Sequence, residues 1–228
     1  NTDALDSEVK DLIFQLCEKV KSLTDEVYSL KEEVNNLKTK VAELEFHNLG
    51  GKGPFSLKDI SSDILTSDEQ LNIMLSFLPK PPKKIERIFS AKNDDNSPGA
   101  FHKKCDGQGP TITLVHSDKG YLFGGFTMKG WNDSDGLVED PESFVFSLDK
   151  KMKFLAKPKS GIKCNTIYGP EFGNSYNDCI YISPYCCSND SSFTRRHSSF
   201  NRPMLQEFSS EDQENFTAKN VEIFKVIN

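Results

Sequence analysis

The sequence has no long apolar run. No stretch of the 228 residues is apolar over the roughly 20 positions that a membrane-spanning helix needs, so we expect no membrane insertion. Residues 1–9 are acidic and contain no apolar core of a secretory signal. Six cysteines are too few for a disulfide scaffold in a chain of this length, which is typical of a reducing compartment. We therefore expect a cytoplasmic protein, with the nucleus as a second location.

The chain also has fewer basic residues than acidic residues. The chain has 28 Lys and Arg residues against 34 Asp and Glu residues, which gives a net charge of -6. Non-specific binding to a phosphate backbone needs a dense positive surface. Nucleic acid is therefore not the favoured partner, although local basic patches are still allowed.

Residues 1–48 contain no glycine and no proline, whereas all 14 glycines and all 11 prolines lie beyond them. The composition changes at residues 50–54, where the sequence Gly-Gly-Lys-Gly-Pro is typical of a helix end followed by a flexible joint. We predict a coiled coil over residues 5–48, a linker over residues 49–59 and a folded domain over residues 60–228.

The first segment repeats every seven residues. Two apolar positions, separated by alternating steps of three and four residues, run through five consecutive heptads, as in the a and d positions of a coiled coil. A single amphipathic helix packed on its own domain would show a wider apolar stripe. The ten residues of this heptad seam, the expected dimer interface, are Ile13, Leu16, Val20, Leu23, Val27, Leu30, Val34, Leu37, Val41 and Leu44.

The seam also indicates how many chains associate. β-Branched residues at a with leucine at d favour two parallel strands. In a parallel homodimer the flanking g and e positions form three attractive pairs, which are Glu26 with Lys31, Glu33 with Lys38, and Lys40 with Glu45. Every a position is apolar, so the sequence leaves a trimer open as the alternative to the parallel homodimer.

A leucine-zipper protein that binds DNA has a basic helix immediately before its zipper. Residues 1–8 instead carry three acidic residues and no basic one, which would repel DNA. A stress-responsive transcription regulator is therefore the alternative interpretation, with DNA bound through basic loops or through a segment upstream of this sequence.

The second segment indicates many strands and few helices. Residues 64–78 read as a helix with a capping box from Thr66 to Glu69, and residues 100–105 as a short helix. Fifteen of the chain's 17 phenylalanines lie beyond residue 48 and supply a rich core, and the pattern predicts two packed sheets. Strands are expected at residues 111–116, 121–128, 143–148, 179–183 and 221–227.

Several motifs of this segment occur in the order found in the TLDc domain family. They include GAFHKKCD at 99–106, GPT at 109–111, GYLFGGFT at 120–127, FVFSL at 144–148, YGPEFG at 168–173, IYI at 180–182 and VEIF at 221–224. Residues 60–228 thus resemble a TLDc domain. The expected fold class is α+β, with an N-terminal parallel coiled-coil helix followed by a β-sandwich flanked by helices.

The resemblance also implies a function. The family is linked to resistance to oxidative stress, some members bind the vacuolar proton ATPase, and no catalytic mechanism is agreed for it. We therefore expect a dimeric protein-interaction or regulatory module, without catalytic activity or cofactor, in the oxidative-stress response. Regulation of the vacuolar proton ATPase is an alternative.

No hydrolase, metalloprotease, Walker or dinucleotide motif occurs, which agrees with a chain that is not an enzyme. No C-x-x-C pair is present to suggest zinc, so no metal site is expected. Cys105 follows two lysines, which could lower its thiol pKa, so it is the candidate redox residue, although a packing role is the simpler interpretation.

Two basic clusters are candidates for contact with an acidic partner or a phosphate group. Solvated loops are the simpler interpretation of both. The first cluster surrounds three prolines and the second precedes two serines. Their members are Lys80, Lys83, Lys84 and Arg87, and then Arg195 and Arg196.

Overall fold

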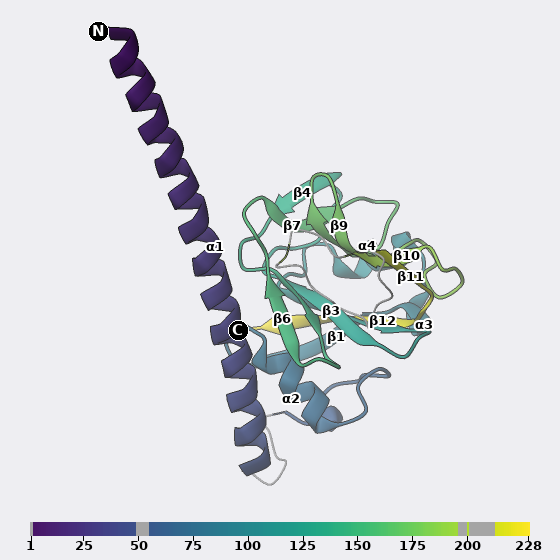
Figure 1. The fold of residues 1–228 in the computed structure, drawn as a ribbon. Coiled ribbons are helices and arrows are strands. Elements are labelled where there is room, and N and C mark those ends of the chain that lie inside the picture. Colours follow the sequence, from purple (N-terminus) through teal and green to yellow (C-terminus); the bar gives the residue numbers. More distant parts are fainter. Residues whose placement is uncertain (1, 49–54, 196–199, 201–212) are drawn as a thin grey trace.

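The computed structural model describes residues 2–48, 55–195, 200 and 213–228 (Figure 1). A long N-terminal helix is followed by two antiparallel six-stranded sheets and a few short helices. The α+β class expected from the sequence is therefore confirmed.

Helix α1 (Thr2–Asn48) is continuous over 47 residues, because no proline or glycine interrupts its backbone hydrogen bonds. Its N-terminal half projects away from the sheets, and its C-terminal half runs beside helix α2 (Asp68–Ser76) and strand β6 (Met152–Leu155) (Figure 1). The predicted helix is thus observed. Its pairing with a second copy stays a prediction.

The first sheet has the strand order β1-β12-β2-β3-β5-β6. Strand β12 lies inside this sheet, paired with β1 on one side and β2 on the other, although it is the last strand in the sequence. Hairpin connections place β2 beside β3 and β5 beside β6. The remaining bounds are β1 (Lys84–Ser90), β12 (Ala218–Ile227), β2 (Thr111–Ser117), β3 (Leu122–Thr127) and β5 (Phe144–Ser147).

The second sheet has the order β11-β10-β9-β8-β7-β4 and packs against the first. Its strands are short, with four or five residues each, and follow a meander from β7 to β11. They are β11 (Gln213–Phe216), β10 (Ser192–Arg195), β9 (Asp178–Tyr181), β8 (Glu171–Asn174), β7 (Ser160–Cys164) and β4 (Gly136–Glu139).

The main core lies between the sheets. Phe123 packs edge-to-face on Phe216, and Trp131 packs edge-to-face on Phe172 with ring centroids 5.7 Å apart. Gly125 of β3 faces the ring of Phe172, and a β-carbon built there would lie 2.5 Å from the nearest ring atom. Gly125 therefore allows a close approach between the two sheets that a side chain would obstruct.

A second core lies on the outer face of the first sheet. There α2 buries Leu71 and Met74, and the following residue Phe77 packs on Phe144 and Phe146 of β5. The hydroxyl of Ser67 caps α2 by accepting a hydrogen bond from the Gln70 amide. The predicted helix therefore starts later than expected, and Ser67 takes the place assigned to Thr66.

Two smaller helices complete the domain, α3 (Ala91–Asp94) and α4 (Pro98–Cys105), together with a 3-10 turn, η1 (Leu57–Asp59). Helix α4 corresponds to the helix expected at residues 100–105. Strand β1 covers Lys84 and Arg87, which the sequence interpretation placed in a solvated loop, so that interpretation is wrong for these two residues.

Candidate interaction surface

The heptad seam of α1 is uncovered in the single chain. All ten seam residues are exposed, with exposed fractions between 48% for Val27 and 63% for Leu16. Contiguous apolar surface of this kind marks an interaction site, because it would otherwise be in contact with water over the length of the helix. The seam is therefore the principal candidate binding surface of the molecule.

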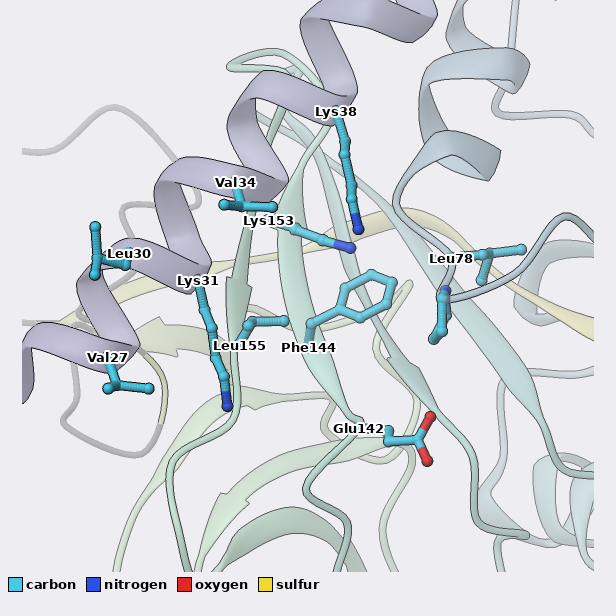
Figure 2. Close-up of a pocket in the computed structure, with 11 residues that line it drawn as sticks. Val27, Leu30, Lys31, Val34, Lys38, Leu78, Glu142, Phe144, Lys153 and Leu155 are labelled. Atoms are coloured by element: carbon cyan, nitrogen blue, oxygen red, sulfur yellow. The ribbon is translucent and has the colours of Figure 1, made fainter. Parts of the chain in front are cut away.

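A pocket of about 520 Å³ lies where α1 runs along the domain. On the helix side it is lined by the seam residues Val27, Leu30 and Val34 and by the e-position lysines Lys31 and Lys38. On the domain side it is lined by Leu78, Pro79, Glu142, Phe144, Lys153 and Leu155. Figure 2 shows Lys38 and Lys153 extending toward each other beside the ring of Phe144. We call this the lysine pocket.

Lys153 is the most buried charged residue of the lysine pocket, with an exposed fraction of 6%. Its ammonium group donates a hydrogen bond to the carbonyl of Phe77 and lies 5.0 Å from the centroid of the Phe144 ring. Burial, followed by the positive charge of Lys38, lowers the pKa of Lys153 to about 8. The lysine pocket therefore combines apolar walls with a local excess of positive charge.

Arg87 of the first basic cluster has a structural role. Its guanidinium donates to the carboxylates of Glu222 at 2.6 Å and Asp63 at 2.9 Å. Glu222 is fully buried, and its carboxylate also accepts hydrogen bonds from the Ser62 hydroxyl and the Asp63 amide. Arg87 thus neutralises a buried charge that joins residues 62–63 to β12.

The three lysines of the same cluster are exposed. Lys84 pairs with Glu86 at 3.3 Å, and the backbone amide of Lys83 extends the pairing of β1 with β12 through the carbonyl of Ile227. Lys80, Lys83 and Lys84 therefore stay candidates for contact with an acidic partner, without Arg87.

Arg195 of the second basic cluster lies in the other sheet. Arg195 ends β10, donates to the side-chain oxygen of Asn177 at 3.1 Å and stacks over the ring of Phe193. Arg196 lies outside the described residues. Arg195 is thus engaged with its own sheet, which is not the sheet of Lys84 and Arg87.

Cys105, the candidate redox residue, is fully buried at the end of α4. Burial, with the negative charge of Asp106 as a second cause, raises the pKa of its thiol. A reactive cysteine needs the opposite conditions, exposure and a lowered pKa. The structure therefore favours the packing role of Cys105.

Sequence reasoning missed Cys187 as a thiol whose surroundings lower its pKa. It is half-buried, and its sulfur lies 4.0 Å from that of Cys186. A hydrogen bond from Cys186, with a further one from Asn96, lowers the thiol pKa of Cys187. The only sequence signal was the adjacency of two cysteines.

These environments predict an order of reactivity. With iodoacetamide at neutral pH, we expect Cys187 to be alkylated at least about tenfold faster than Cys105. The thiolate is the reacting form, and the lowered pKa of Cys187 gives it a larger thiolate fraction than the buried Cys105 has. Peptide mass spectrometry over a time course measures both rates in one sample, with the fully buried Cys179 as an internal reference for protected thiols. Equal rates for Cys187 and Cys105 would contradict this assignment.

A further charged group that the sequence did not indicate lies in the second sheet. Lys163 of β7 lies 2.9 Å from Asp178 and 3.6 Å from Glu171. Burial, and next the charge of Asp178, raises the pKa of Glu171 to about 7. This group ties three neighbouring strands together.

The described residues bear on two classes of function, metal binding and membrane insertion. They contain no group of three or more His, Cys, Asp or Glu side chains arranged to hold a metal ion. None of the helices they form is long and apolar enough to cross a membrane.

The sequence is similar to known proteins. The TLDc domain family model matches residues 59–227. The MTOR-associated protein MEAK7 of Danio rerio is 35% identical over 66 residues, which is 29% of this chain and 15% of that protein. The chain thus matches only a small part of this longer relative. Because the family model covers well over half of the sequence, the chain belongs to the TLDc domain family.

Proposed function

We propose that this protein is a homodimeric regulatory module, in which a parallel coiled coil of two α1 helices presents two TLDc domains to protein partners. The observation that supports the proposal best is the uncovered heptad seam, which is apolar at every a and d position from residue 13 to residue 44. Two binding domains on one dimer raise the avidity for a partner that has two sites.

Membership of the TLDc family and the name of the MEAK7 relative support a role in protein binding rather than catalysis. The family resemblance makes the oxidative-stress response a candidate setting and the vacuolar proton ATPase a candidate partner. DNA binding has less support, because Arg87 is used within the fold and Arg195 lies in a different sheet from Lys84.

Replacing Leu23 and Leu30 together with aspartate tests the dimer. Two charges in the seam would be buried against the partner helix, so we expect monomers at micromolar concentration. The TLDc core does not include these residues and should keep its circular dichroism spectrum and melting temperature. Sedimentation equilibrium measures the mass.

The matched control replaces Ser22 and Ser29 with aspartate. These exposed residues each precede one of the two leucines and lie outside the seam, so the same added charge should leave the dimer intact. Monomeric wild-type protein, or a Leu23→Asp, Leu30→Asp variant that stays dimeric, would overturn the proposal.

A further inference from the structure

The domain lies beside the seam without covering it. Val27, Leu30 and Val34 line the lysine pocket, yet their exposed fractions of 48%, 60% and 49% are close to those of the seam residues far from the domain, such as Ile13 at 56%. The e-position residues Lys31 and Lys38 line the same pocket. The domain therefore lies on the e side of α1, and the seam stays open to a second helix.

A second helix on this seam would fill the pocket with its own g-position residues. In a parallel coiled coil each e residue faces a g residue of the other chain. The residues opposite Lys31 and Lys38 would be the partner's Glu26 and the partner's Glu33. Both glutamates are exposed in the single chain, so their carboxylates are available for such contacts.

The domain wall of the pocket fits the same occupant. Leu78, Phe144 and Leu155 provide apolar surface beside the seam, and Lys153 adds a third positive charge close to Lys38. A second α1 helix carries leucine and valine at its a and d positions and glutamate at two neighbouring g positions. Its apolar side chains match the apolar wall of the pocket, and its glutamates match the lysines.

We infer that the lysine pocket is the docking site for helix α1 of a second copy of this chain. Each TLDc domain then lies in the corner between its own α1 and the α1 of its partner, with the partner's Glu33 beside Lys38 and Lys153. Two-fold symmetry repeats this contact and places the two domains on opposite sides of the coiled coil. The inference rests on the proposed dimer and adds a contact between the domain of one copy and the helix of the other.

Zero-length cross-linking between unlabelled and ¹⁵N-labelled chains tests the contact directly. Full-length protein at natural abundance is mixed with ¹⁵N-labelled protein, allowed to exchange subunits and treated with a carbodiimide, which joins carboxylates to amines. We expect mixed-isotope peptides that link Glu26 or Glu33 to Lys153. Lys151 and Glu69, whose charged groups lie 3.1 Å apart within one chain, supply a same-isotope control.

The outcomes separate this inference from the proposed function. A dimer by sedimentation that gives no mixed-isotope link to Lys153, or only same-isotope links, overturns the inference and leaves the dimer standing. A monomer overturns both. A small anionic molecule seen by native mass spectrometry on each chain, in place of the mixed-isotope link, also overturns the inference.

A substitution supplies a second measurement. Leu155→Glu places a carboxylate where the partner's Glu33 is expected, so we expect about a tenfold weaker dimer, the change that corresponds to 1.4 kcal/mol. Leu137→Glu is the control, since Leu137 is also half-buried on an edge strand but belongs to the other sheet. Equal dissociation constants for the two variants would contradict the contact, provided that both keep the circular dichroism spectrum of the folded domain.

Discussion

Replacing Arg87 with methionine should lower the free energy of unfolding by about 3–5 kcal/mol, the usual cost of removing one member of a buried ion pair. The variant leaves the Glu222 carboxylate fully buried without its cation, and Asp63 loses the same partner. The hydrogen bonds from Ser62 and the Asp63 amide stay in place but supply no full positive charge. Urea denaturation followed by circular dichroism measures the change.

Lys84→Met is the matched control for this prediction. Lys84 is on the same strand and pairs with Glu86, but both side chains are more than half exposed, so we expect a loss of about 0–1 kcal/mol. Adding Glu222→Gln to Arg87→Met removes the unpaired charge and should restore part of the stability. An Arg87→Met variant as stable as Lys84→Met would show that Glu222 is not a buried unpaired charge in that variant.

Gly125→Ala should destabilise the domain by about 1–3 kcal/mol through overpacking between the sheets. The added methyl group would lie 2.5 Å from the ring of Phe172, and that ring is fixed by Trp131 and by complete burial. Neither sheet can move away without disturbing its neighbour. Thermal denaturation compared with the wild type measures the loss.

Gly99→Ala is the control for the glycine substitution. A β-carbon at Gly99 meets no atom within 4 Å, and the residue lies in the first turn of α4. Alanine there should raise the stability by about 0.4–1 kcal/mol, because it reduces the freedom of the unfolded chain. A Gly125→Ala variant that melts at or above the wild-type temperature would contradict the predicted contact.

Local patterns made α1 and five strands predictable. The seven-residue period of α1 lies within one helix and needs no information about the rest of the chain. Strands β2 and β3 are apolar runs separated by a turn, and the sequence predicted them to within two residues. These elements depend mainly on their own residues.

Other elements were missed because distant residues stabilise them. The sequence of β1 has four charged residues among its first five positions when Lys83 is included, and its pairing with β12 joins segments more than 130 residues apart. Except for β9, which matches the strand expected at residues 179–183, the short strands of the second sheet carry too few residues for alternation to be recognised. Their hydrogen bonds come from the whole meander.

The same distinction applies to the candidate site. The seam follows from the local seven-residue period, and its role as an interface stays a prediction. The lysine pocket could not be predicted, because Lys153 and Leu155 lie more than 110 residues from Lys38. Arg87 was assigned to a partner-binding cluster for the same reason, since its carboxylate partner Glu222 follows 135 residues later. Charge in a sequence does not reveal which charges the fold itself uses.

The position of β12 sets an order of events during synthesis. Strands β1 and β2 become neighbours only through β12, so the first sheet cannot close until residues 218–227 have left the ribosome. Helix α1 emerges much earlier and needs no other part of the chain to form its hydrogen bonds. In the proposed dimer, two nascent chains on one messenger RNA therefore join through their helices while both domains are still incomplete.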